Sequence, residues 1–447
     1  MTGIVDTINK LKRFLQPNKK RTQPVIIPRA EHNISRSNIS KSAIKVLYRL
    51  KDAGYCAYLV GGGVRDLLLG QHPKDFDVVT NARPQEIRRL FRNSQLIGRR
   101  FRLVHVLFGH EVIEVATFRA HDAGFSQDHA QNDDGMIVRD NVYGDIEDDA
   151  WRRDCSINAL YYNIADFSVE DYTGGMADIN AGIVRIIGDP VKRYQEDPIR
   201  ILRVIRLAAR FNFKVEALTE KPILELSGLL QNVPSARLYV EIMKLFCDGH
   251  AQASFELLRH YGLYALLFPQ SEACLQGPQH EFTYSFLTHA FYSIDQRCLH
   301  HKPVSAAFLF AAMLWNPLQQ AIEKNRQTKI PLLADLDHAM DVILKNQLMH
   351  IAIPRRMADL VREIWILQYR LPRRHQGEAV RLLGHPQFRA AYDFLLLRAK
   401  AGEEVYGLAN WWTKFQDASE DTRIEMIKKI KETASRSQRR PPRKKEK

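Results

Sequence analysis

The sequence contains no apolar run of about 18 residues, few cysteines and no standard phosphate-binding glycine motif. The first absence argues against a membrane span. The five cysteines are scattered and form no CxxC pair, so neither a disulfide framework nor a zinc site is expected. They are typical of small core residues in a reducing compartment, and we expect a cytoplasmic protein. The glycine-rich turn at residues 61–63 matches neither GxxxxGK(S/T) nor GxGxxG, which argues against P-loop and dinucleotide-binding folds.

Acidic residues are outnumbered by basic ones, 51 to 65, which gives a formal net charge of +14 and a pI near 9.5. Such an excess indicates a polyanionic partner, because Lys and Arg bind phosphates and release counterions. Part of the excess lies in the segment Lys10–Arg21 and in the tail after Arg436, where solubilising chain ends would explain it equally well. The basic residues of the interior have no such explanation.

The 447 residues are too many for one core and predict about three domains. After a flexible basic leader, residues 1–40, a helix begins at the Ser40 N-cap and ends at Gly54. Strands at 57–60, 75–80, 104–108 and 112–118 alternate with helices at 64–69 and 83–91, and a polar loop follows at about 120–135. Beyond about residue 190 the pattern is helical. The expected fold is therefore a small mixed α/β sheet with helices, followed by an all-α C-terminal half.

The first candidate site is the strand–glycine turn–helix segment from Leu59 to Gly70. Glycines allow a ligand to approach the backbone closely, and a helix N-terminus favours phosphate. Arg65, in the first helical turn, is a candidate for a bidentate phosphate contact. Taken alone, the glycines are a weak signal, and a tight turn is the more frequent explanation.

The second candidate site is the pair Asp75 and Asp77. Residues i and i+2 of a strand point to the same side, so both carboxylates face one way while Phe76 faces the core. Adjacent like charges need a cation, and hard oxygen ligands suit Mg²⁺. A lone DxD is common at strand ends, but its position after the glycine turn makes it more specific. Glu114 and Asp154 are the further carboxylates available, and an unpaired Glu114 in an apolar strand would be costly.

The third candidate site is an arginine stripe at helical spacing, which follows Glu196-Asp197-Pro198. Four aligned arginines repel one another, so an anionic ligand or nearby acids are implied. Asp197 is either a helix cap before a proline or a ligand-binding carboxylate. The arginines of the stripe are Arg200, Arg203, Arg206 and Arg210.

These motifs resemble the class II nucleotidyltransferases, which are the CCA-adding enzymes and the bacterial poly(A) polymerases. The resemblance is carried, in family order, by LVGGGVRDLLLG, DFDVVT, RRDCSINALYYN and EDPIRILRVIRLAARF, between about Leu59 and Phe211. RRFRLVHV, a GHPQFRAAYD segment and the arginine-rich end are similar to the poly(A) polymerase branch. The resemblance implies template-independent addition of AMP from ATP to RNA 3′ ends, with release of pyrophosphate, in mRNA processing and decay.

By resemblance, each site residue receives a role. Asp75 and Asp77 match the Mg²⁺ ligands, and Asp154 matches a third active-site acid, for which Glu114 is the alternative. Asp197 and Arg200 match the pair that reads the base edge. The remaining matches are nucleotide contacts at Gly62, Arg65, Arg153, Arg203 and Arg206.

The implied organisation is a catalytic head at 41–190, a base-reading neck at 191–255, an RNA-binding body at 256–430 and a disordered basic tail at 431–447. In the body, Arg373 and Arg374 lie among basic residues near Trp365 and Tyr369, a mixture that suits single-stranded RNA. For any one of these residues, a solvated helix face with core aromatics is the favoured explanation, and Trp411 and Trp412 are expected in the core. We expect a monomer that uses RNA and ATP. The alternatives are CCA addition to tRNA and an inactive fold that only binds RNA.

Overall fold

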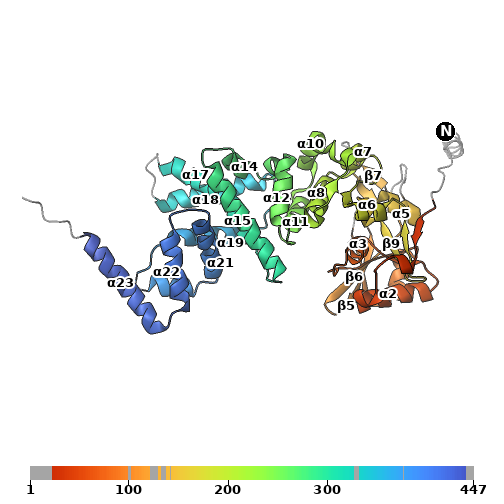
Figure 1. The fold of residues 1–447 in the computed structure, drawn as a ribbon, viewed down its shortest axis with the longest axis horizontal. Helices are drawn as coiled ribbons and strands as arrows, with labels where there is room; N and C mark the ends of the chain where they lie inside the picture. The colour runs from red at the N-terminus through yellow and green to blue at the C-terminus, as the bar shows by residue number, and fades with distance from the viewer. Residues whose placement is uncertain are drawn as a thin grey trace, which may run out of the picture. The chain divides into compact units, whose positions relative to one another are not determined.

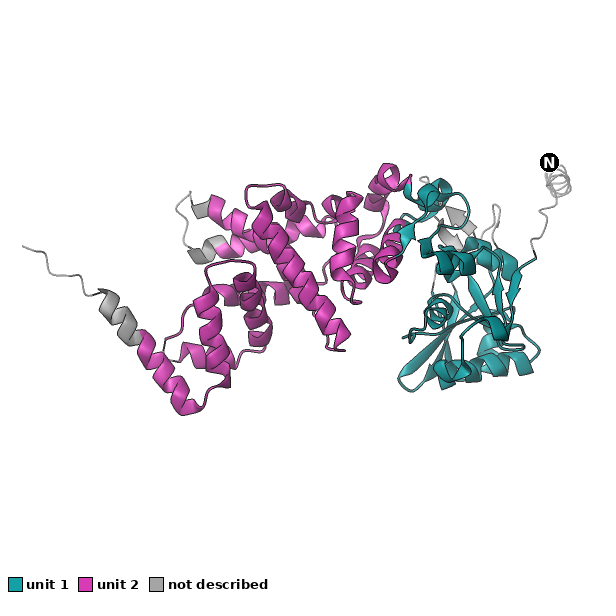
Figure 2. Ribbon diagram, in the orientation of Figure 1, with its two compact units in different colours: residues 1–200, 213–220 teal, residues 201–212, 221–447 magenta. Residues whose placement is uncertain are grey.

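The computed structural model describes residues 23–98, 102–120, 129–131, 137–140, 142–326, 332–375 and 377–438. The chain forms two compact units, drawn in teal and magenta in Figure 2. Unit 1 comprises Met1–Arg200 and Phe213–Glu220, and unit 2 comprises Ile201–Asn212 and Lys221–Lys447. Helix α8 (Ile199–Phe211) has residues in both units.

Unit 1 is built on an eight-stranded mixed sheet. All neighbouring strands are antiparallel except β3 and β6, which are parallel. A parallel pair needs a crossover, and the chain between them supplies a helix and two strands. The strand order is β1 (Val25–Ile27), β10 (Val169–Asp171), β9 (Leu160–Asn163), β2 (Ala57–Val60), β3 (Asp77–Thr80), β6 (Glu111–Thr117), β5 (Leu103–Phe108) and β4 (Ser94–Ile97).

The helices of unit 1 at 41–52, 62–68 and 84–90 form where the sequence pattern predicts them, whereas those at 146–152 and 175–181 were not predicted. Ser40 caps the first by accepting a hydrogen bond from the Ala43 N–H, and residues 43, 46, 47 and 50 are buried at helical spacing. Figure 1 shows this helix, α2, beside the strands. The helices are α2 (Lys41–Asp52), α3 (Gly62–Leu68), α4 (Pro84–Leu90), α5 (Ile146–Arg152), α6 (Gly175–Ala181), α7 (Pro190–Glu196) and α9 (Ala217–Glu220).

Smaller elements complete unit 1. Two short parallel strands pair with each other, and a short hairpin contains two antiparallel strands. The expected polar loop at about 120–135 lies largely outside the described residues. Bounds of the smaller elements are β11 (Ile183–Val184), β12 (Lys214–Val215), β7 (His129–Gln131), β8 (Ile137–Asp140), η1 (Arg29–Glu31), η2 (Arg36–Asn38) and η3 (Ser156–Asn158).

Unit 2 contains only helices among its described residues. One part of its core is aromatic, with Phe246 stacked on Phe291 at 5.1 Å. Another part surrounds the fully buried Trp412. The elements are α8, α10 (Ile223–Leu226), η4 (Ser227–Asn232), α11 (Ser235–Phe246), α12 (Ala251–His260), α13 (Leu263–Leu267), α14 (Pro269–Leu275), α15 (His280–Leu299), α16 (Ala306–Met313), α17 (Trp315–Arg326), α18 (Leu332–Leu348), α19 (Arg355–Arg370), α20 (Glu378–Leu383), α21 (Phe388–Lys400), α22 (Tyr406–Asp417) and α23 (Glu420–Gln438).

The predicted fold class is confirmed: a mixed sheet with helices precedes an all-helical half. The predicted five-part division stays a prediction, and helix α23 continues past residue 430, where the tail was expected to begin. None of the described helices has the length and apolar character needed to cross a membrane.

Candidate active site

A glycine turn and the first residue of β3 meet at one end of the sheet. The register of β2 and β3 places Val60 opposite Asp77, so Gly61 follows directly beside that carboxylate. A Cβ atom at Gly61 would lie 3.6 Å from Asp77 Oδ2 and 3.7 Å from Arg153 Nη1. Gly61 has φ +76° and ψ −143°, which a residue with a side chain rarely adopts. The turn therefore brings a carboxylate, Asp77, and a guanidinium, Arg153, from separate motifs together beside a glycine that has no side chain.

Asp75 and Asp77 flank a phenylalanine that faces the core. Phe76 is buried, whereas Asp75 is exposed and Asp77 is half-buried, which is the alternation expected of extended backbone. A Cβ atom at Gly63 would lie 3.3 Å from the main-chain oxygen of Asp75, so the glycine turn packs closely on this segment. The arrangement leaves carboxylate oxygens within reach of solvent at the turn.

Glu114 is the in-register neighbour of Asp77 on the parallel strand β6. Its side chain is 51% exposed, and its Oε1 lies 3.2 Å from Nε2 of His105 on β5. The expected cost of an unpaired charge in an apolar strand is therefore avoided, because this part of the sheet face is open and a histidine is the partner. Among the described residues, no three His, Cys, Asp or Glu side chains form a complete metal site by themselves.

Asp154 holds the turn that follows helix α5. Its Oδ1 accepts hydrogen bonds from the Cys155 N–H at 2.7 Å and from Nδ2 of Asn158 at 3.1 Å. Asn158 Oδ1 in turn accepts a hydrogen bond from Nη1 of Arg65 at 2.5 Å. The third motif is thereby linked to the first through a single asparagine.

Arg65 is buried, and its guanidinium is bound within the protein. Nε and Nη2 both donate to Oδ1 of Asp66, at 2.9 and 2.7 Å. A Cβ atom at Gly62 would lie 3.2 Å from Nη2 of Arg65, so the glycine makes room for the guanidinium. The bidentate phosphate contact expected of Arg65 would have to share donors that already bind Asp66 and Asn158.

Arg153 is held by a buried acid and a buried phenol. Its Nε and Nη2 donate to Oδ2 of Asp149 at 3.1 and 2.9 Å, and Nε also donates to the Tyr161 hydroxyl at 2.9 Å. The Tyr161 hydroxyl itself donates to Asp149 Oδ2 at 2.8 Å. Burial acts to lower the pKa of Arg153, but Tyr161 and Asp149 outweigh it and raise the pKa. Arg153 therefore stays charged in a fixed orientation next to Gly61.

Arg193 ties helix α7 to the Arg152–Arg153 backbone. Its Nη2 donates to both main-chain oxygens, at 2.6 Å for Arg153, and its Nη1 pairs with Glu196 at 2.7 Å. Burial, reinforced by the charge of Arg200, lowers the pKa of Arg193 to about 10. A second arginine, Arg152, has a pKa well below its ordinary value, chiefly through burial and then through neighbouring arginines. This concentration of positive charge fits an anionic ligand.

Arg200 is oriented by Glu196 and by the main chain of α7. Its Nη1 donates to the Arg193 carbonyl at 2.7 Å and to Glu196 Oε2 at 2.9 Å. Burial acts to raise the pKa of Glu196, but Arg193 and Arg200 outweigh it and lower the pKa. Asp197 is buried at the C-cap of α7, and α8 begins at Ile199. Asp197 therefore ends one helix just before the next begins.

Arg203 and Arg206 belong to unit 2, where a buried acid lies beside both. Arg206 Nε is 2.9 Å from Oε1 of Glu241 on α11, and Arg203 Nε is 4.0 Å from Oε2. The arginine stripe predicted either an anionic ligand or nearby acids, and Glu241 is such an acid. Arg210 instead lies over the ring of Phe211, at 5.0 Å.

Of the aromatic residues considered in the helical body, Trp365 and Trp412 are buried, whereas Tyr369 and Trp411 are half-buried. Trp365 is fully buried and donates its Nε1–H to the Ala311 carbonyl, which agrees with the favoured expectation of a core aromatic. Tyr369 bonds Gln319 through its hydroxyl. Trp412 is in the core as predicted, but Trp411 is only half-buried and carries Arg374 over its ring.

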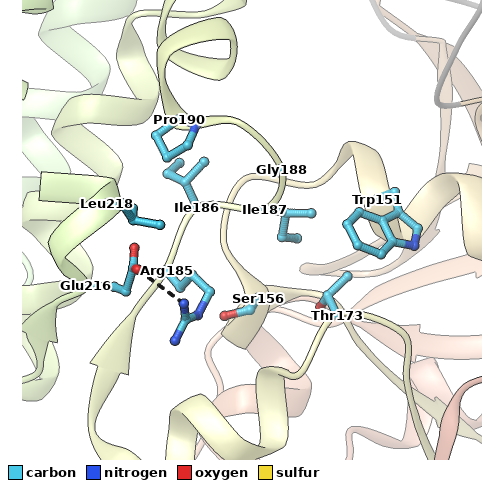
Figure 3. A pocket seen from close by; sticks show the side chains of 10 residues that line it. All are labelled: Trp151, Ser156, Thr173, Arg185, Ile186, Ile187, Gly188, Pro190, Glu216 and Leu218. Atoms are coloured by element: carbon cyan, nitrogen blue, oxygen red, sulfur yellow. Dashed lines mark ion pairs between the residues drawn. The ribbon is translucent and has the colours of Figure 1, made fainter. Parts of the chain in front are cut away.

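A separate pocket of about 300 Å³ lies in unit 1, and Figure 3 shows the residues that line it. Trp151 and Ile187 supply apolar surface. The cation of the pocket, Arg185, lies 3.3 Å from Glu216 and 3.1 Å from Asp178. None of the predicted site residues lines this pocket, and its charge is balanced, so it is not assigned to the nucleotide.

Several residues that organise the site carried no role in the sequence analysis. Asp149 has a local signal, since it lies four residues before Arg153. Arg193 and Asn158 also have local partners, Glu196 and Asp154. Their bonds to Arg153 and Arg65, like the contacts of Tyr161 and Glu241, join residues of different elements.

Family models match three parts of the chain. Residues 57–185 match the "Poly A polymerase head domain", residues 212–275 the "Probable RNA and SrmB-binding site of polymerase A", and residues 328–446 the "Polymerase A arginine-rich C-terminus". The mixed sheet with carboxylates at its glycine turn is thus the head of a nucleotidyltransferase.

Individual relatives show which branch of the nucleotidyltransferases this chain belongs to. The chain is 46% identical over 431 residues to "Poly(A) polymerase I" of Salmonella typhi, covering 95% of this chain and 93% of the relative. It therefore belongs to the bacterial poly(A) polymerase I family. A "CCA-adding enzyme" of Lactobacillus helveticus is 37% identical over 48% of this chain and 52% of the relative.

A solved structure shares the fold. The Bacillus stearothermophilus CCA-adding enzyme in complex with CTP has a TM-score of 0.57 and 21% identity, over 90% of this chain and 83% of that one.

Proposed function

We propose that the chain adds AMP from ATP to RNA 3′ ends without a template and releases pyrophosphate, as a polynucleotide adenylyltransferase in mRNA processing and decay. The observation that carries the proposal is 46% identity to a poly(A) polymerase I over 95% of the chain. RNA and ATP as substrates fit a cytoplasmic enzyme, and we propose that it acts as a monomer.

The role that we propose for each site residue follows from its position. Arg153, fixed by Asp149 and adjacent to Gly61, is placed to bind triphosphate oxygens, and guanidinium matches phosphate geometry. Positively charged donors that are already oriented stabilise developing phosphate charge at little reorganisation cost. Gly62 and Arg65 support the same turn.

Asp75 and Asp77 fit a magnesium site. They are hard oxygen donors at an accessible turn, and Mg²⁺ is commonly held by one or two carboxylates together with substrate phosphates. These residues would hold Mg²⁺, whose chemistry is to neutralise phosphate charge and to make the RNA 3′-hydroxyl more acidic. Glu114, in register with Asp77, is the better placed additional carboxylate, while Asp154 orders the Asn158–Arg65 contact.

Asp197 and Arg200 would read the adenine edge. Arg200 is held by Glu196, so its direction is set before the nucleotide arrives. A base with mismatched donors would leave buried groups unpaired, which costs about 1–3 kcal/mol for each group. Arg203 and Arg206 are proposed as further nucleotide contacts, with Glu241 setting their orientation.

A gel assay tests the reaction with purified protein, Mg²⁺, a labelled oligoribonucleotide and each NTP supplied singly. A long ladder with ATP alone supports the proposal. A short stop after CTP and ATP on tRNA ends would instead indicate CCA addition.

Asp77→Ala separates an enzyme from an inactive RNA-binding fold. We expect the variant to lose extension and to keep RNA affinity within a few-fold of wild type. Parallel loss of RNA binding would undermine the assigned role of Asp77. A wild-type protein that binds RNA but extends it with no nucleotide would favour the inactive fold.

A further inference from the structure

Arg374 lies over the ring of Trp411 in unit 2. Its guanidinium carbon is 5.2 Å from the ring centroid, and Trp411 stacks on Phe415 at 4.5 Å and 15°. Arg423 lies over Phe415 at 5.7 Å. Two arginines thus lie over one pair of stacked rings on helix α22, which is labelled in Figure 1. Arg374 lies between α19 and α20 in the sequence, and Arg423 belongs to α23.

The two arginines differ in what their N–H groups meet. Arg423 donates from Nε to the Phe415 carbonyl at 2.9 Å and from Nη2 to the Gln416 carbonyl at 2.7 Å. In the described part of the chain, the buried Nε of Arg374 has no hydrogen-bond partner. Burial alone lowers the pKa of Arg374, without an opposing carboxylate. Because this Nε is buried, a ligand from solvent would meet the Nη groups of Arg374.

The acid nearest in sequence is already engaged. Glu378 pairs with Arg370 and with Arg381, each at 2.9 Å. Arg373 and His375, on either side of Arg374, are exposed. Arg373 and Arg374 therefore carry positive charge that Glu378, the first residue of α20, does not neutralise.

We propose that Arg374, supported by Trp411 and assisted by Arg373, binds a backbone phosphate of single-stranded RNA. The inference rests on the proposed function and names where the helical unit holds its substrate, outside the matched RNA-binding segment at 212–275. A guanidinium can bind a phosphate through two parallel hydrogen bonds, and an aromatic ring beneath it fixes the plane. RNA is favoured over an acidic protein because of the net charge of +14 and the RNA substrate class.

Arg389 provides a matched control. Its guanidinium also lies over an aromatic ring, that of Tyr392 at 5.5 Å, but it pairs with Asp393 at 2.9 Å. Arg374→Gln and Arg389→Gln therefore remove the same charge from similar stacked settings. Only the first removes an arginine that lacks an acid partner among the described residues.

The experiment measures the affinity of the full-length protein for a 20-nucleotide oligo(A) RNA by fluorescence anisotropy over a salt series. Arg374→Gln should weaken binding about fivefold or more and reduce the steepness of the log–log salt dependence by about 0.7, the value for one phosphate on a single strand. Arg389→Gln should stay within about twofold, with an unchanged slope.

Circular dichroism establishes whether Arg374→Gln is folded. Arg373→Gln, at an exposed position, provides a second reading and should also lower the salt slope. Wild-type affinity and slope in folded Arg374→Gln would overturn the proposal and point to another anion, such as an acidic protein surface. Because the assay measures binding, failure of adenylate addition would leave this comparison readable.

Discussion

Arg153 donates two hydrogen bonds to one carboxylate oxygen of Asp149, four residues earlier in the chain. The Asp149 side chain is 7% exposed, and the same oxygen accepts from Tyr161. This buried acid sets the direction of an arginine whose Nη1 points to the glycine turn. The pairing links core packing on the sheet to the charge arrangement of the site.

Asp149→Asn should weaken ATP use and stability together. The change leaves the Arg153 charge without its buried partner, and breaking such a pair costs about 3–5 kcal/mol. We expect KM for ATP to rise about tenfold or more, and the thermal midpoint to fall. Asp148→Asn, at a more exposed position of α5, is the control and should change neither quantity strongly. Equal behaviour of the two variants would contradict the positioning role.

Gly61→Ala should lose activity far beyond its effect on stability. The added methyl would lie near Asp77 Oδ2 and Arg153 Nη1, on a backbone conformation that alanine disfavours. Gly70→Ala is the matched control, because Gly70 has φ +70° and open space around its Cβ position. It should cost about 1–2 kcal/mol in stability, as left-handed alanine does, and retain kcat. Comparable kcat in both variants would show that the approach at Gly61 is unimportant.

Glu114→Gln and Asp154→Asn should separate two kinds of carboxylate. Glu114 is in register with Asp77, so its amide variant should need more Mg²⁺ for half-maximal extension. Asp154 acts on Asn158 and the following turn, so Asp154→Asn should lower activity without a comparable change in the Mg²⁺ requirement. Extension rates measured over a Mg²⁺ titration distinguish them. The opposite pattern would make Asp154 the third catalytic acid.

Glu196→Gln should change the pH dependence of stability. The folded-state pKa of Glu196 is lowered from its usual 4.5 by Arg193 and Arg200. A lowered carboxyl pKa stabilises the folded state above the unfolded pKa, and this contribution disappears as pH falls through the folded pKa. Wild type should therefore exceed the variant in urea stability at neutral pH, with a gap that narrows below about pH 4.5. A gap independent of pH would exclude this ionisation as the cause.

Much of the head was predictable from local pattern. The helix over 41–52 follows from the Ser40 cap and its apolar spacing, and the strand at 57–60 follows from a short apolar run ended by glycine. The strand predicted at 75–80 begins only at Asp77. Strand β4 of the large sheet was not predicted, and neither were β1, β9 and β10. Their residues acquire strand structure by pairing with partners distant in the sequence, such as Val25 with Asp171.

The fold class, the order of the motifs and the chemical types of the site residues follow from the amino-acid sequence alone. Those properties depend on residue identity and short spacing, which local rules describe. Which of these groups contact one another depends on the tertiary structure: strand register places Asp77 beside Glu114, and packing brings Arg153 into contact with Asp149 and Tyr161. It also placed Trp365 in the core and left Trp411 half-buried beneath Arg374. Such pairings depend on burial and long-range register, which no short window of sequence specifies.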